Sequence, residues 1–187
     1  IYMEEEFHNH MRIPWHDYTR KSIGRPITEA SLSEKASIIG RTGIMLLSCG
    51  TGAWRVRSSM NTLARELGIT CTADIGLLSI EYTCIDGGNC YTESLCLFNT
   101  GVNTSKLYRM EEFVNKFAGN CKKMSGDELH TLLDRIHEIH GFYSPPFLGL
   151  AAAVACCAFT FLLGGGPVEM FCAFLGAGAG NYLRAKM

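Results

Sequence analysis

An 18-residue run without a charged side chain, Pro146 to Leu163, constrains this chain more than any other feature of its sequence. As a helix rising 1.5 Å per residue, the run would be about 27 Å long, close to the roughly 30 Å hydrocarbon core of a bilayer. It lacks the polar stripe that the surface helix of a soluble protein turns to water. The sequence therefore favours a membrane-spanning helix over a helical hairpin buried in a soluble core.

A second apolar run, Val168 to Leu183, follows the break at Gly164-Gly165-Gly166-Pro167 and carries one acid, Glu169. We predict two membrane helices, over about 146–163 and 168–183. Arg184 and Lys186 come directly after them, and the N-terminus lacks the pattern of a signal peptide. Positive charge marks the cytoplasmic side, so we expect both ends of the hairpin, and the preceding domain, to face the cytoplasm.

The rest of the chain has a different composition. Of the 35 charged residues, 17 basic and 18 acidic, only three lie in residues 146–187. The formal charge of −1 is unlike the basic excess of nucleic-acid-binding modules, so we expect no nucleic acid as a partner. Nine cysteines without a paired CxxC spacing indicate reduced core residues rather than a disulfide framework or a zinc site.

Periodicity and turn chemistry predict an α+β domain over residues 33–145. Helices are expected over about 33–49, 53–67 and 105–117, the second with Val56, Met60, Leu63 and Leu67 on one face. Strands are expected near 69–75, 78–84 and 90–98, with the last two joined in a hairpin by Asp86-Gly87-Gly88-Asn89. Two Ser-x-x-Glu capping boxes, Ser31–Glu34 and Ser125–Glu128, open helices. Residues 1–32 are predicted to form an extended arm.

Several segments in this order resemble the threonine/serine exporter family, the YjjP-like membrane proteins. They are the Gly52-Ala53 pair, a helix that ends at Leu67-Gly68, a hairpin with an Asp86-Gly87 turn, and Gly101-Val102-Asn103 before a helix. The resemblance covers about residues 35–187. It implies an exporter of small polar metabolites, threonine and serine or, in two-subunit versions with a YjjB-like partner, succinate.

The family resemblance also implies a place in the cell. It indicates a multi-pass protein of the inner (cytoplasmic) membrane with its soluble domain in the cytoplasm. About five membrane helices follow that domain in the family, whereas two are predicted here. We therefore expect a subunit or fragment that depends on further helices, from a YjjB-like partner or a homo-oligomer. Gly176-x-x-x-Gly180 is a small-residue pattern that suits such packing.

Candidate site residues are few. Glu169 is an ionisable group at a membrane helix, Asn181 is a polar group near the other end, and Arg55 could meet an anionic substrate at the cytoplasmic mouth. They form the predicted substrate-binding set for a small carboxylate or amino acid. No catalytic residue, metal site or cofactor is predicted. The sequence contains no GxxxxGK[ST] nucleotide-binding loop, which argues against transport driven by ATP.

Two alternatives to an exporter stay open. The first is a membrane-anchored interaction or regulatory domain without transport activity of its own. The second is a membrane-bound hydrolase built on Cys49 or on the helix that carries His130, His137 and His140. We do not favour an enzyme, because no base lies near Cys49 in the sequence and the histidines lack the i, i+4 spacing of a zinc helix.

Overall fold

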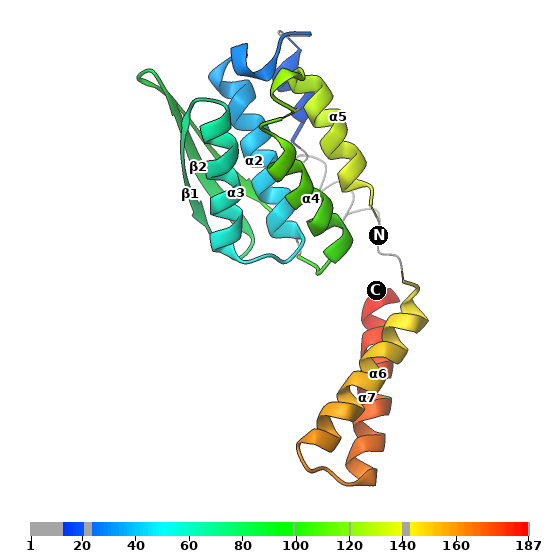
Figure 1. Ribbon diagram of the computed structural model, residues 1–187. Helices are drawn as coiled ribbons and strands as arrows, with labels where there is room; N and C mark the ends of the chain where they lie inside the picture. The colour runs from blue at the N-terminus through cyan, green and yellow to red at the C-terminus, as the bar shows by residue number, and fades with distance from the viewer. Residues whose placement is uncertain (1–12, 21–23, 99, 120, 140–142, 187) are drawn as a thin grey trace, which may run out of the picture. The chain divides into compact units, whose positions relative to one another are not determined.

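A computed structural model describes residues 13–20, 24–98, 100–119, 121–139 and 143–186 of the protein. The chain divides into two compact units, residues 1–140 and 141–187, and each is described by itself (Figure 1). His140 and residues 1–12 and 21–23 of the predicted N-terminal arm lie outside the described residues.

The first unit is a mixed unit of helices and a small sheet, in the order η1 (Trp15–Thr19), η2 (Ile27–Glu29), α2 (Leu32–Ser48), α3 (Ala53–Glu66), β1 (Thr70–Ile75), β2 (Ser79–Asp86), β3 (Asn89–Cys96), α4 (Thr104–Lys116), η3 (Cys121–Lys123) and α5 (Gly126–His137). The second unit contains α6 (Pro145–Leu162) and α7 (Pro167–Lys186). The predicted combination of helices and a small antiparallel sheet is therefore confirmed.

The sheet is antiparallel, with strand order β1-β2-β3. Its β2–β3 hairpin closes at the Asp86↔Asn89 pair, as the turn chemistry predicts. Gly87 and Gly88 have φ of 54° and 91°, the left-handed conformation that tight hairpin turns require. Ile80, Tyr82 and Cys84 are buried on one face of β2, in agreement with the predicted period of two.

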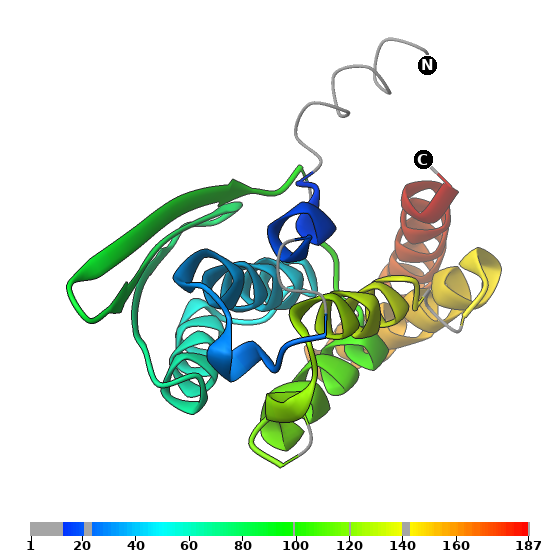
Figure 2. The same ribbon diagram turned by 90° about the horizontal axis from the view of Figure 1, so that it is seen from above.

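Helix α2 lies at the centre of this unit. All residues from 34 to 47 are buried, because β2 and β3 cover one side of the helix and α3, α4, α5 and η1 cover the others (Figure 2). Two glycines permit this close packing. A Cβ at Gly40 would lie 2.2 Å from the Tyr82 hydroxyl oxygen, and one at Gly43 would lie 2.6 Å from the sulfur of Met60.

The predicted apolar faces of the other helices also point inward. The buried residues of α3, α4 and α5 include Val56, Met60, Leu63, Met110, Phe113, Val114, Leu129, Leu133 and Ile136. These residues form one core cluster with α2 and the sheet. At about 25 cal/mol per Å² of apolar surface removed from water, such burial is the main stabilising contribution to the fold.

The segment before α2 is packed against the unit, although the sequence predicts an extended arm over 1–32. Its described part forms η1 and η2. Ile27 and Thr19 are buried, and the Ile27 amide donates to the Met124 carbonyl at 2.9 Å. This segment buries apolar surface and satisfies backbone groups, which periodicity alone does not reveal.

The two predicted capping boxes have different outcomes. At α5, the box is complete: the Glu128 amide donates to Ser125 Oγ, and the Ser125 amide donates back to Glu128 Oε2 at 2.8 Å. At α2, only the first half forms, since the Glu34 amide donates to Ser31 Oγ at 3.4 Å. The prediction of a full capping box at Ser31 is wrong, because the reciprocal hydrogen bond, from the Ser31 amide to the Glu34 carboxylate, does not form.

The second unit is a helical hairpin. Its helices pack closely at Gly149, where a Cβ would lie 3.0 Å from the Gly178 carbonyl oxygen. Gly176 and Gly180 have no atom within 4 Å of such a Cβ, so they lie off this contact. Asn181 Nδ2 donates to the Leu148 carbonyl at 2.9 Å across the hairpin. Among the described helices, α6 alone is both long and apolar enough to be recognised as a membrane span.

A substitution at Gly40 tests the packing of α2. We expect Gly40→Ala to lower the stability of the α+β unit by about 1–3 kcal/mol, because the methyl group must displace the buried Tyr82 ring. Thermal unfolding followed by circular dichroism measures the change. Gly101→Ala is the matched control, since a Cβ there meets nothing within 4 Å. Equal effects of both variants would contradict the close approach.

A second glycine pair tests the hairpin. Gly149→Leu places a side chain against the backbone of α7 and should lower the unfolding temperature of the detergent-solubilised protein. Gly180→Leu should leave the hairpin intact, because that position faces open space within the unit. An unchanged unfolding temperature for Gly149→Leu would show that the two helices do not pack at this point.

Candidate functional site

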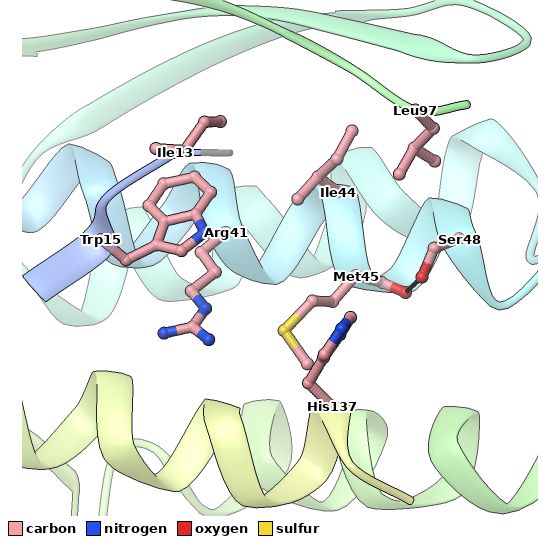
Figure 3. Close-up of a pocket in the computed structure, with 8 residues that line it drawn as sticks. All are labelled: Ile13, Trp15, Arg41, Ile44, Met45, Ser48, Leu97 and His137. Atoms are coloured by element: carbon pink, nitrogen blue, oxygen red, sulfur yellow. Dashed lines mark hydrogen bonds between the residues drawn. The ribbon is translucent and has the colours of Figure 1, made fainter. Parts of the chain in front are cut away.

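A cavity of about 400 Å³ opens in the first unit between α2 and α5 (Figure 3). Its walls come from η1 and the segment before it, from α2, from the residue that follows β3 and from the end of α5. The lining residues are Ile13, Trp15, Arg41, Ile44, Met45, Ser48, Leu97 and His137. Most of these side chains are apolar. The polar groups are a guanidinium, a hydroxyl and an imidazole, a combination typical of small-molecule sites.

Arg41 is the charged group of this cavity and is only 5% exposed. Its side chain reaches from α2 toward α5, below the Trp15 ring, and its guanidinium carbon lies 5.8 Å from the centre of that ring (Figure 3). It forms an ion pair with Asp134 and donates to the His130 carbonyl at 3.0 Å. A buried arginine needs such partners, because an unpaired buried charge costs several kcal/mol.

His130 is a fully buried neighbour of Arg41. Burial, and then the Arg41 charge, lower its pKa to about 3, so the imidazole is neutral at physiological pH. Its Nδ1 accepts from Arg41 at 3.2 Å, which leaves the proton on Nε2, 3.1 Å from Ser37 Oγ. Ser37 in turn donates to the Glu34 carbonyl at 2.7 Å. Each member of this chain has a defined donor or acceptor role.

His16 joins η1 to α5 at the rim of the network. Its Nδ1 lies 2.6 Å from Asp127, and its Nε2 lies 2.8 Å from Asp134. The hydrogen bond to Asp127, and then that to Asp134, raise the pKa of His16 above its usual 6.5. Two carboxylates on the two ring nitrogens favour the doubly protonated imidazolium, since both nitrogens then donate.

The remaining polar groups of the cavity are suited to binding rather than catalysis. Burial, and then the charges of Lys106 and Arg41, lower the pKa of His137, so it offers a neutral imidazole. Ser48 donates to the Met45 carbonyl at 2.7 Å.

Cys49, the candidate nucleophile, is buried, and burial raises the pKa of its thiol. A protonated thiol is a poor nucleophile, which argues against the hydrolase alternative.

The three predicted substrate residues are not gathered in this cavity. Arg55 is exposed on α3 and forms an ion pair with Glu111 on α4 at 2.9 Å. Glu169 is exposed in the first turn of α7, and Asn181 lies twelve residues later on the same helix, about 18 Å further along its axis. Their roles in substrate binding stay predictions. The structure describes no cluster of three or more metal-ligating side chains within its residue ranges.

Sequence reasoning missed Arg41, Asp134 and His16. One signal was present, since Arg41 is a lone charge within the apolar run Ile38 to Leu47. The pairing of Arg41 with α5 was not visible, because the partners are separated by 93 residues in the sequence. His16 lies 118 residues before Asp134.

The raised pKa of His16 gives a pH-dependent contribution to stability. The ion pairs are fully present below pH 6.5, the unfolded value, and are lost as pH rises through the higher folded pKa. We therefore expect wild type to exceed His16→Gln in unfolding temperature more at pH 6 than at pH 9. His130, with a pKa of about 3, stays neutral throughout this range. A difference in unfolding temperature between wild type and His16→Gln that grows toward pH 9 would contradict the pairing of a protonated His16 with Asp127 and Asp134.

Comparison with known proteins identifies the family. The family model for threonine/serine exporters, ThrE, matches residues 37–187, which include α2 from Ser37 onward, the sheet, the cavity residue Arg41 and the α6–α7 hairpin. No curated protein and no solved structure matches the chain. The match agrees with the resemblance seen in the sequence and covers well over half of the chain. This protein belongs to the threonine/serine exporter family.

Proposed function

We propose that this chain is a subunit or part of a secondary exporter of small amino acids or dicarboxylates, with threonine and serine as the first candidates and succinate-like acids as the second. The observation that carries the proposal is the family match across both units, residues 37–187. Membership in a transporter family implies transport and a membrane location. It also favours a carrier over an enzyme.

We further propose that α7 spans the membrane together with α6. The α7 helix has 20 residues and would be about 30 Å long. Several of its large apolar side chains, such as Phe171, Leu175 and Leu183, are not covered by the rest of the hairpin and are exposed, as residues that face lipid or a partner would be. In this proposal the protein is a multi-pass protein of the inner membrane, and both ends of the hairpin and the α+β unit lie on the cytoplasmic side, because two spans return the chain to the side from which it entered.

A hairpin alone does not enclose a substrate path, so the proposal includes further helices. A YjjB-like partner subunit or a second copy of this chain would supply them. Gly176 and Gly180 are available for close packing, because nothing within the hairpin occupies the space beside them. In this arrangement Glu169 and Asn181 would contact a small carboxylate or amino acid in the membrane, and Arg55 would meet it at the cytoplasmic mouth.

Efflux from loaded cells tests this function. Cells that express the chain with a YjjB-like partner should release preloaded labelled threonine, serine or succinate several-fold faster than cells with the partner alone. Glu169→Gln should reduce this release if the carboxylate contacts substrate, whereas Glu81→Gln, an exposed position on β2, should not.

The outcome separates the two main alternatives. Release above background from cells that express both chains would support the exporter. A membrane-inserted protein that binds a partner but causes no release of any of the three substrates would favour the membrane-anchored regulatory domain. Loss of release in both the Glu169 and the Glu81 variants would show an effect on expression rather than on the site.

A further inference from the structure

Among the described residues of the first unit, the ionisable side chain with a buried oxygen that lacks a hydrogen-bond partner is Glu34, in the first turn of α2. The residue is only 3% exposed, and its Oε2 atom is buried without a hydrogen-bond partner in the described part of the chain. Buried polar groups in folded proteins nearly always have partners, and a buried carboxylate without one is costly. The position of Glu34 therefore needs a physical reason.

The same motif elsewhere in the chain shows what Glu34 could have done. At α5, Glu128 turns back and accepts from both the Ser125 amide at 2.8 Å and the Ser125 hydroxyl at 3.1 Å. At α2, the Ser31 hydroxyl instead lies 3.0 Å from the Ser33 hydroxyl, and Glu34 leaves the reciprocal bond unmade. One oxygen of the Glu34 carboxylate is thus left without a hydrogen-bond partner among the described residues.

A cavity of about 360 Å³ lies at this point, within the range of small-molecule sites. Glu34 lines it together with two further acids, Asp17 and Glu29, and with the hydroxyl residues Ser31 and Ser33. This lining is polar and carries an excess of negative charge. It differs from the apolar Arg41 cavity, with which it shares no lining residue.

The cavity also offers donors for an anionic group. Arg25 lines it, is exposed, and forms no ion pair with any other described residue. The N-terminus of α2, a helix of 17 residues, borders the cavity at Ser31 and Ser33. Backbone amides at such a terminus favour a carboxylate. Carboxylates for an ammonium group and donors for a carboxylate thus line one cavity.

We propose that this cavity binds a small α-amino acid, with the ammonium group at Glu34 and the carboxylate at Arg25 and the first amides of α2. The physiological meaning, a substrate-responsive site in the soluble unit of an exporter, rests on the proposed function. The binding itself does not depend on it. An ammonium group supplies three donors, one of which would satisfy the Glu34 oxygen that has no partner among the described residues.

Binding to the full chain in detergent tests the proposal. The probes are L-serine and L-threonine, with ethanolamine lacking the carboxylate and lactate lacking the ammonium group. The two amino acids should raise the unfolding temperature of wild type, because a ligand that binds the folded state stabilises it. Ethanolamine should bind more weakly than serine, and lactate should give no shift. Absence of a shift with both amino acids would overturn the proposal.

Two variants locate the site. Glu34→Gln should weaken amino-acid binding about tenfold or more in calorimetry, since a charge-assisted hydrogen bond is lost. Arg25→Gln should weaken serine binding but leave ethanolamine binding unchanged. Glu81→Gln, exposed on β2, is the matched control and should change neither affinity. Serine binding that survives Glu34→Gln would place the ligand elsewhere and overturn the assignment.

The unfolding temperatures of two variants without ligand test whether Glu34 has a purely structural role. Glu34→Gln should unfold at the wild-type temperature or above it, because it removes a buried charge without a partner. Glu128→Gln should unfold at a lower temperature, because a neutral amide oxygen replaces the charged acceptor of two hydrogen bonds at a helix N-terminus. Equal destabilisation by both substitutions would overturn the proposal. Efflux that persists when amino-acid binding fails would leave the exporter function intact and reject this site alone.

Discussion

The contact between Gly40 and Tyr82 determines how the first unit is built. The Tyr82 hydroxyl lies 3.1 Å from the Ala36 carbonyl, so the ring rests directly on the backbone of α2. Any side chain at position 40 would hold the sheet away from the helix. Because the sheet covers α2 from this side, the other faces of the helix are left for α3, α5 and η1.

The burial of α2 in turn explains the polar network. A helix covered on all sides must satisfy its polar residues within the protein, and Ser37 and Arg41 do so through His130 and Asp134 on α5. His16 extends the network to η1. The family match begins at residue 37, so Ile13 and Trp15 line the Arg41 cavity from outside the matched region.

Local patterns were a good guide to the elements of this fold and a poor guide to its sites. The period of α3 and the Asp86–Asn89 turn were sufficient to predict a helix and a hairpin within a few residues of their ends. The two Ser-x-x-Glu motifs are alike in sequence, yet only one closes, because the second hydrogen bond depends on surroundings that the motif does not encode. Long-range pairs such as Arg41–Asp134 arise from tertiary packing and leave no periodic signal.

The point where the chain leaves the first unit is held by hydrogen bonds. Asn103 caps α4 through its Oδ1 and donates from Nδ2 to the Ile139 carbonyl at 3.3 Å, two residues after α5 ends. Gly101 donates to the Ser48 carbonyl at the end of α2. The ends of α2 and α5 and the start of α4 are therefore linked to one another by hydrogen bonds within three residues, Gly101 to Asn103, so that this short segment fixes three helix ends at once.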